Sequence, residues 1–158
     1  MRREVFFYTW AWAAIVDSDD AAHQIATEFY EAYLKSGLKP VTTNYILAET
    51  LSLLRGRIHH QAVLQFVEIV FRRIASKDIV YERIDSEREK KALELLKKYH
   101  DKPEISFFDL TSFVVMRELN IQNAFTGDEH FDHVDKDIQR LFHLVKRQWK
   151  LKKVQKWN

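Results

Sequence analysis

The chain has 158 residues, which is enough for one domain with a substantial buried core. It is 46% apolar, 13% aromatic and 30% charged, its formal net charge is +2, and its three glycines and two prolines favour helices over turn-rich β structure. The lack of cysteine excludes a disulfide framework, a thiolate metal site and a thiol nucleophile, so any metal must be held by carboxylates or histidines.

The N-terminal region begins with a short apolar run, Val5–Tyr8, which predicts a buried first strand. Acidic residues at 17–20 follow too soon after this run for a membrane span or a secretory signal, so we expect a cytoplasmic protein. The same acidic residues supply N-cap candidates for a helix that ends with Gly37 in a C′ position.

The middle and the second half of the chain alternate strands with helices. We expect, in order, strand 41–42, helix 44–55 capped by Thr43 or Asn44, helix 60–75, strand 79–81, a charged outer helix 86–99, a helix capped by Ser106, strand 123–126 and strand 141–145. This order predicts an α/β fold with a mostly parallel central sheet, helices on both faces and right-handed crossovers.

The last residues of the chain are basic, and we separate a domain over 1–145 from a basic tail over 146–158. The tail has no acid, so with a total charge of +2 and six cations in the tail the preceding residues carry a net charge of −4. The six cations of the tail are Lys146, Arg147, Lys150, Lys152, Lys153 and Lys156. Trp149 and Trp157 lie between these cations, a pattern that can follow a phosphate backbone and stack on bases. A solvated extension with no ligand is the equal alternative.

Three acids are candidates for a functional site. Glu49 is the only charge between Asn44 and Arg55, Asp109 falls in the first turn of a predicted helix, and Asp128 follows a predicted strand. Carboxylates at such element ends can meet in the crevice at the strand ends of an α/β sheet. Together they would form a hard oxygen site for Mg²⁺ or Mn²⁺, which orients phosphate oxygens and activates water, so a phosphodiester is the implied substrate.

The same acids have structural alternatives. Ser106 and Asp109 fit a capping box, Glu49 can face solvent on its helix, and Asp128 can be a turn residue. His130 and His133, three residues apart, form a less favoured transition-metal alternative. Phosphate-loop, dinucleotide-binding and nucleophile-elbow motifs are absent, so P-loop NTPases, Rossmann oxidoreductases and α/β-hydrolases have no support.

Four segments, in this order, resemble the PIN-domain family and more narrowly the VapC-type toxins of bacterial and archaeal toxin–antitoxin pairs. They are VFFYTWAW with the trailing DSDDAAH, TTNYILAETLSLL, SFFDLTSFVVMRELNI and AFTGDEHF, and the similarity extends to about Leu144. The resemblance implies a three-layer α/β/α fold, an acidic cleft that binds Mg²⁺ or Mn²⁺, and endoribonuclease cleavage of RNA. It also implies a homodimer and a small antitoxin protein that covers the cleft.

The family pattern carries over to particular residues. Its second, third and fourth acids match Glu49, Asp109 and Asp128, and Thr126 matches the hydroxyl residue often found ahead of the last acid, while Thr9 supports the same site. The first acid is missing.

Tyr8 stands before Thr9 where family members typically have an aspartate. A phenol, with a pKa of about 10, is neutral at pH 7 and cannot simply replace an anionic ligand. The resemblance therefore leaves two readings, a weakened enzyme or an inactive PIN module that still binds RNA or an antitoxin. A plain interaction module, whose acids only cap helices and solvate the surface, stays open as a third.

Overall fold

The structure is a computed structural model that describes residues 4–127 and the backbone of 139–140. In this part of the chain, short strands pair in parallel to form one sheet of order β3-β2-β1-β4-β5. The strands are β1 (Val5–Phe7), β2 (Val41–Thr43), β3 (Val80–Glu82), β4 (Asn123–Phe125) and β5 (Gln139–Arg140).

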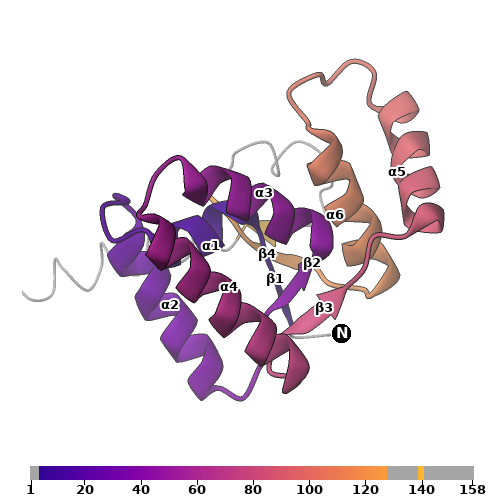
Figure 1. The fold of residues 1–158 in the computed structure, drawn as a ribbon. Coiled ribbons are helices and arrows are strands. Elements are labelled where there is room, and N and C mark those ends of the chain that lie inside the picture. The colour runs from indigo at the N-terminus through magenta and orange to yellow at the C-terminus, as the bar shows by residue number, and fades with distance from the viewer. Residues whose placement is uncertain (1–3, 128–138, 141–158) are drawn as a thin grey trace, which may run out of the picture.

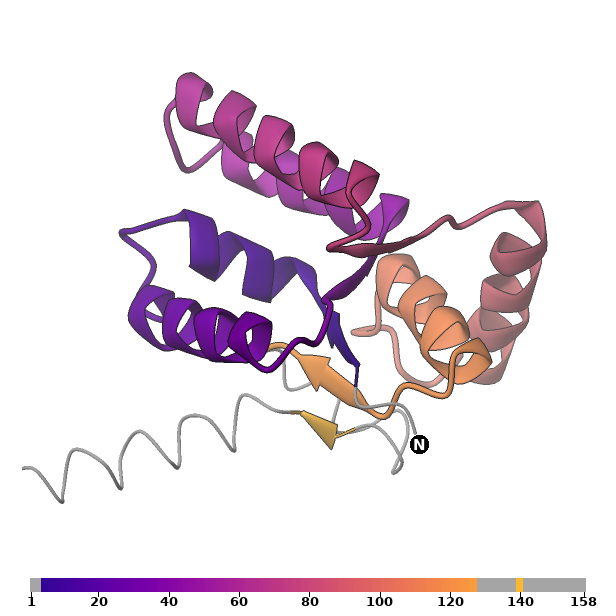
Figure 2. The same ribbon diagram turned by 90° about the horizontal axis from the view of Figure 1, so that it is seen from below.

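The helices lie on both sides of this sheet, as Figure 1 and Figure 2 show. They are α1 (Thr9–Val16), α2 (His23–Lys35), α3 (Asn44–Arg55), α4 (His60–Ala75), α5 (Ser86–Lys98) and α6 (Phe107–Glu118). From β1 to β3 the chain steps in one direction across the sheet, and from β3 to β4 it returns. Right-handed connections therefore place α5 and α6 on the face opposite α1 and α2.

β1 lies at the centre of the sheet, and its position decides where a ligand can bind. Phe6 is paired with Val41 of β2 on one side and with Ala124 of β4 on the other. After β1 the chain crosses to β2 on one side of it. After β4, which lies on the other side of β1, the chain crosses to β5 in the opposite direction. Such a switch point opens a crevice beyond the carboxyl ends of the strands.

An aromatic cluster fills the space between the sheet and the helices α1 and α2. Phe7 and Phe125 are fully buried on neighbouring strands, and the ring centroids of Phe29 and Phe125 are 4.2 Å apart. The hydroxyl of Tyr33 accepts a hydrogen bond from Val5 N at 2.9 Å and donates one to Lys39 O at 2.9 Å. Tyr33 therefore ties the start of β1 to the chain that leads into β2.

Most of the predicted elements are confirmed. Helices 44–55 and 60–75 have the predicted limits, Thr43 and Ser106 are N-caps, and Gly37 has the expected positive φ of 78° after α2. Strand β4 ends one residue earlier than predicted, β3 is shifted by one residue, and α5 ends at Lys98. The predicted strand 141–145 lies outside the described residues.

The region between β1 and α2 was predicted less well. Helix α1 was not expected, because its residues are apolar on all sides and show no helical period. The prediction that the acids at 17–20 cap α2 is wrong: the N-cap is Ala22, which makes no side-chain cap bond. Asp17 and Asp20 instead accept hydrogen bonds from Asp19 N and Ala22 N, and so build the turn between α1 and α2.

A search of the described helices for an apolar stretch long enough to cross a membrane finds none.

Candidate active site

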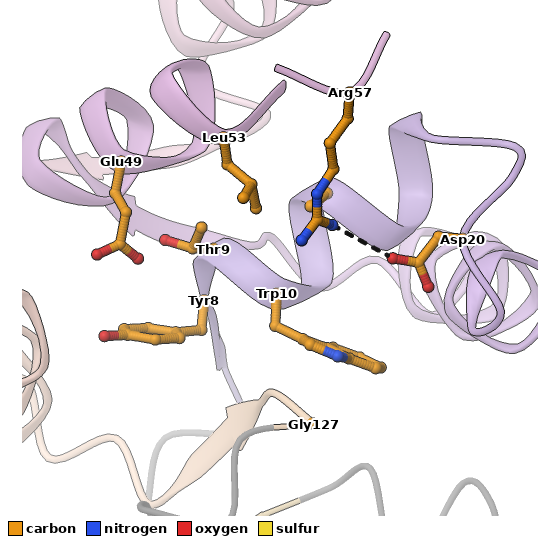
Figure 3. Close-up of a pocket in the computed structure, with 9 residues that line it drawn as sticks. Tyr8, Thr9, Trp10, Asp20, Glu49, Leu53, Arg57 and Gly127 are labelled. Carbon is orange, nitrogen blue, oxygen red and sulfur yellow. Dashed lines mark ion pairs between the residues drawn. The ribbon is translucent and has the colours of Figure 1, made fainter. Parts of the chain in front are cut away.

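A pocket of about 300 Å³ opens where β1 ends, between α1 and α3 (Figure 3). Its walls come from four parts of the chain: the end of β1 with α1, the turn before α2, the helix α3 with the turn that follows it, and the end of β4. The lining residues are Tyr8, Thr9, Trp10, Ala13, Asp20, Glu49, Leu53, Arg57 and Gly127.

Glu49 is held in place by a well-anchored helix. The Thr43 hydroxyl caps α3 by accepting a hydrogen bond from Ile46 N at 3.1 Å. The Asn44 side chain accepts a hydrogen bond from Ile84 N at 2.6 Å, which ties the start of α3 to the segment after β3. Glu49 is half-buried on this helix and lines the pocket.

Tyr8 and Thr9 enter the pocket because β1 ends there. Tyr8 N donates a hydrogen bond to Phe125 O at 3.3 Å, and Tyr8 is then the N-cap of α1. Only 4% of Tyr8 and 5% of Thr9 are exposed. Figure 3 shows the Thr9 hydroxyl directed toward the Glu49 carboxylate, with the phenol of Tyr8 on the same side of the pocket. Among the described residues, Thr9 Oγ1 has no hydrogen-bond partner.

Asp109 has the structural role that the capping box predicts. Its Oδ2 accepts a hydrogen bond from Ser106 N at 2.9 Å, and Asp109 N donates one to Ser106 Oγ at 3.1 Å. Asp109 is 4% exposed and is not among the residues that line the pocket. The capping interpretation of Asp109 is therefore confirmed.

Helix α6, whose first turn holds Asp109, nevertheless packs against α3, the helix that carries Glu49. The ring of Tyr45 on α3 lies 5.9 Å from the ring of Phe108 at the start of α6. Glu49 follows Tyr45 by four residues, which is one helical turn on the same face. The two helices that carry these acids thus pack against each other.

The third predicted acid and several other candidates cannot be placed in the same way. Asp128, His130, His133 and the basic tail lie outside the described residues. Thr126, at the end of β4, is fully buried. That Glu49, Asp109 and Asp128 share one ion stays a prediction.

The pocket is a partial match to a hard divalent cation. Among the described residues, no three histidine, aspartate or glutamate side chains lie close enough together to hold a metal ion. The Glu49 carboxylate and the buried Thr9 hydroxyl, which has no described partner, are oxygen donors of the kind that Mg²⁺ and Mn²⁺ prefer. A cation here needs further carboxylates from outside this set.

Three aromatic or charged residues of the pocket were not predicted as site residues: Trp10, Asp20 and Arg57. Arg57 Nη1 lies 3.8 Å from Asp20 Oδ2, across the mouth of the pocket. The sequence holds one signal for Arg57, since Leu53 and Arg57 follow Glu49 at intervals of four. Trp10 and Asp20 offer no comparable signal, because Trp10 lies on the unexpected helix α1 and Asp20 in the turn that follows it.

By sequence and by structure, the chain is similar to the same group of known proteins. A model of the PIN domain matches residues 6–137. The chain is 35% identical over 130 residues to the 23S rRNA-specific endonuclease VapC20 of two Mycobacterium tuberculosis strains, CDC 1551 and H37Rv, covering 80% of this chain and 91% of the relative. It also matches the crystal structure of Mycobacterium tuberculosis VapC20, described as a sarcin-ricin loop cleaving toxin, with a TM-score of 0.68 and coverage of 78% and 89%.

Proposed function

Because this chain belongs to the PIN-domain family and is homologous to a VapC toxin, we propose that it is an endoribonuclease of the VapC type that cleaves ribosomal RNA. The family and the three-layer α/β fold predicted from sequence are both confirmed. The observation that carries the proposal is 35% identity along 91% of an rRNA-specific endonuclease. The position of Glu49 in a pocket at the strand ends supports it.

We assign three acids as the ligands of Mg²⁺ or Mn²⁺: Glu49, Asp109 and Asp128, with Thr9 and Thr126 as supporting hydroxyl residues. Glu49 and Asp109 lie on helices that pack together, and Thr9 Oγ1 is directed toward Glu49. A bound divalent cation would supply the positive charge that stabilises the phosphate oxygens as phosphorus is attacked.

The residues of the pocket have their own part in the reaction. The Glu49 carboxylate accepts a hydrogen bond from a water molecule and orients it toward the phosphorus of an RNA phosphodiester. Thr9 Oγ1 can donate a hydrogen bond to a substrate phosphate oxygen, because Thr9 lines the pocket and this hydroxyl has no described partner. Attack by the water oxygen forms a new P–O bond and breaks the opposite one. The attacking water passes a proton through the Glu49 carboxylate to solvent, and the departing oxygen takes a proton from solvent.

Tyr8 is the residue at which the chain departs from the family pattern, and this departure lowers the proposed activity. It is buried in the pocket wall beside Thr9, and it contributes a phenol where the family typically has a carboxylate. One anion fewer weakens the attraction for a cation. The alternative function, a PIN module that binds RNA or an antitoxin without cutting, rests on this residue alone.

The proposed partners follow from the same family membership. We assign RNA as substrate, a cognate antitoxin as inhibitor, a homodimer as the assembly and the cytoplasm as the place of action. The basic tail, with Lys146, Arg147, Lys150, Lys152 and Lys153, is a further proposed RNA contact.

Cleavage of an RNA hairpin that carries the sarcin-ricin loop tests the proposed function. With Mn²⁺ present, the natural chain should cut the hairpin, and Glu49→Gln should reduce the rate about 100-fold or more. Glu68→Gln is the matched control, since Glu68 is exposed on α4 and its ion pair with Arg72 is exposed as well. Equal rates for all three proteins, or no cleavage by any of them, would contradict the proposal.

A further inference from the structure

The pocket has a cationic end as well as an acidic one. Arg57 N donates a hydrogen bond to Leu54 O at 2.9 Å, so the chain continues a helical turn beyond the end of α3. Glu49, Leu53 and Arg57 therefore follow one another along one side of this segment, and all three line the pocket. A carboxylate and a guanidinium stand at the two ends of that row (Figure 3).

Asp20 lies within ion-pair distance of the Arg57 guanidinium beside the pocket. Asp20 is anchored in the turn before α2, where its Oδ1 accepts a hydrogen bond from Ala22 N at 2.8 Å. Its other oxygen, Oδ2, lies 3.8 Å from Arg57 Nη1, beyond hydrogen-bonding distance. Asp20 thus biases the direction of the Arg57 side chain without occupying its donors.

The ion pair has little value for stability. The Arg57 side chain is 45% exposed and that of Asp20 is 20% exposed, and pairs of this kind contribute about 0–1 kcal/mol. A guanidinium has five N–H donors in a planar fork that fits two phosphate oxygens at once. Among the described residues, Asp20 is the only carboxylate within ion-pair distance of Arg57, so the fork remains available to a ligand.

Trp10 forms a wall of the pocket near its cationic end. Its indole lies below the Arg57 guanidinium in Figure 3. A flat aromatic wall next to a cation and a carboxylate is the set of groups that an RNA strand can contact by base stacking and by a phosphate. An inorganic anion would use the cation alone.

We propose that Arg57 binds a backbone phosphate of the RNA substrate next to the phosphate under attack, and that Asp20 positions it. This inference rests on the proposed function, because it assumes that RNA enters the pocket with the reacting phosphate at the Glu49 end. Arg57 then holds the strand in register while the chemistry takes place at the other end of the row.

Binding of a short single-stranded RNA, measured by fluorescence anisotropy over a range of salt concentrations and without divalent cations, tests this role. Arg57→Gln should weaken binding about tenfold, and the slope of log affinity against log salt should fall by about 0.7 for the one lost phosphate contact. Arg57→Lys, which keeps the charge but loses the fork, should bind more weakly while keeping the slope. Arg72→Gln is the matched control, since Arg72 is 70% exposed on α4 and lines no part of the pocket.

The outcomes separate this inference from the proposed function. If the natural chain binds and cleaves RNA and Arg57→Gln matches Arg72→Gln in affinity and slope, the role of Arg57 is overturned and the nuclease proposal stands. A loss of slope in Arg57→Lys as large as in Arg57→Gln also overturns it. If the natural chain neither binds nor cleaves RNA, the proposed function fails and this inference fails with it.

Discussion

The indole of Trp10 occupies the space that a side chain on residue 127 would need. A Cβ built on Gly127 would lie 2.4 Å from Cε2 of Trp10 and 2.6 Å from its Nε1, closer than real contacts allow. The same indole meets the ring of Phe125 edge-on, with 5.9 Å between ring centroids. Glycine at 127 therefore lets the ends of β1 and β4 close on one wall of the pocket.

Gly127→Ala should push the Trp10 indole out of this position. We expect the free energy of unfolding to fall by about 1–3 kcal/mol, because an overpacked contact forces side chains off their preferred rotamers. Chemical denaturation measures the loss. Gly56→Ala is the control, since its Cβ would meet only Leu53 O at 3.7 Å and the backbone there has a negative φ of −88°. Equal stability of the two variants would contradict this reading of Gly127.

Tyr8→Asp should restore the missing anion beside Thr9. We expect the affinity for Mn²⁺, measured by isothermal titration calorimetry, to rise about tenfold or more, because an added carboxylate near Glu49 attracts the cation. Tyr8→Phe is the control, since it removes the phenol oxygen without adding charge.

The same variant decides among the three functional readings. Cleavage of RNA by Tyr8→Asp but not by the natural chain would make this protein an inactive PIN module. No heat of Mn²⁺ binding from either chain would favour a plain interaction module. Binding and cleavage by the natural chain, increased in Tyr8→Asp, is the result that the proposed function predicts.

Ser106→Ala and Asp109→Asn should separate the capping role of Asp109 from its proposed metal role. Ser106→Ala removes the acceptor for Asp109 N and should lower the free energy of unfolding by about 1 kcal/mol, with RNA cleavage retained. In Asp109→Asn the amide oxygen can still accept from Ser106 N, so the cap largely survives while an anionic ligand is lost. Cleavage should then fall about 100-fold or more. Full activity in Asp109→Asn would leave Asp109 with the capping role alone.

Tyr33 should make the fold sensitive to alkaline pH. Burial raises the pKa of Tyr33 from 10.0 to about 12, so the folded state holds the phenol proton more tightly than the unfolded state does. The stabilisation is complete below pH 10 and is lost as the pH rises from 10 to 12. Denaturant unfolding across this range should show a steeper loss in the natural chain than in Tyr33→Phe.

At neutral pH the same variant should be less stable, by about 1–2 kcal/mol, because Val5 N loses its acceptor and Lys39 O its donor. Parallel curves for the two proteins between pH 10 and 12 would show that other groups cause the alkaline loss.

The sequence predicted the fold well where a pattern repeats. Helix 60–75 has an apolar stripe of helical period, and Thr43 and Ser106 are typical caps, so both limits and caps were found. Residues 9–16 lack such a stripe because α1 is buried on several sides, and a helix covered all round shows no period. The error over the acids at 17–20 followed, since a turn and a cap use the same residue types.

The site was predicted in part for a similar reason. A resemblance to a family identifies residues one by one, and two of those that it identified, Glu49 and Tyr8, line the same pocket. It says nothing of Arg57 and Trp10, whose positions depend on how the turns around α1 and α3 meet. A three-dimensional arrangement of separate turns leaves no signature in a single sequence.

The pairing of Phe6 with Ala124 determines the stage of synthesis at which the pocket can form. The central strand β1 leaves the ribosome early. Its neighbour β4 is translated only after nearly all of the rest of the described chain. The pocket needs both Tyr8 and Gly127, so it cannot form on a nascent chain that stops short of β4. A chain built on this plan has no complete pocket while most of its own synthesis is under way.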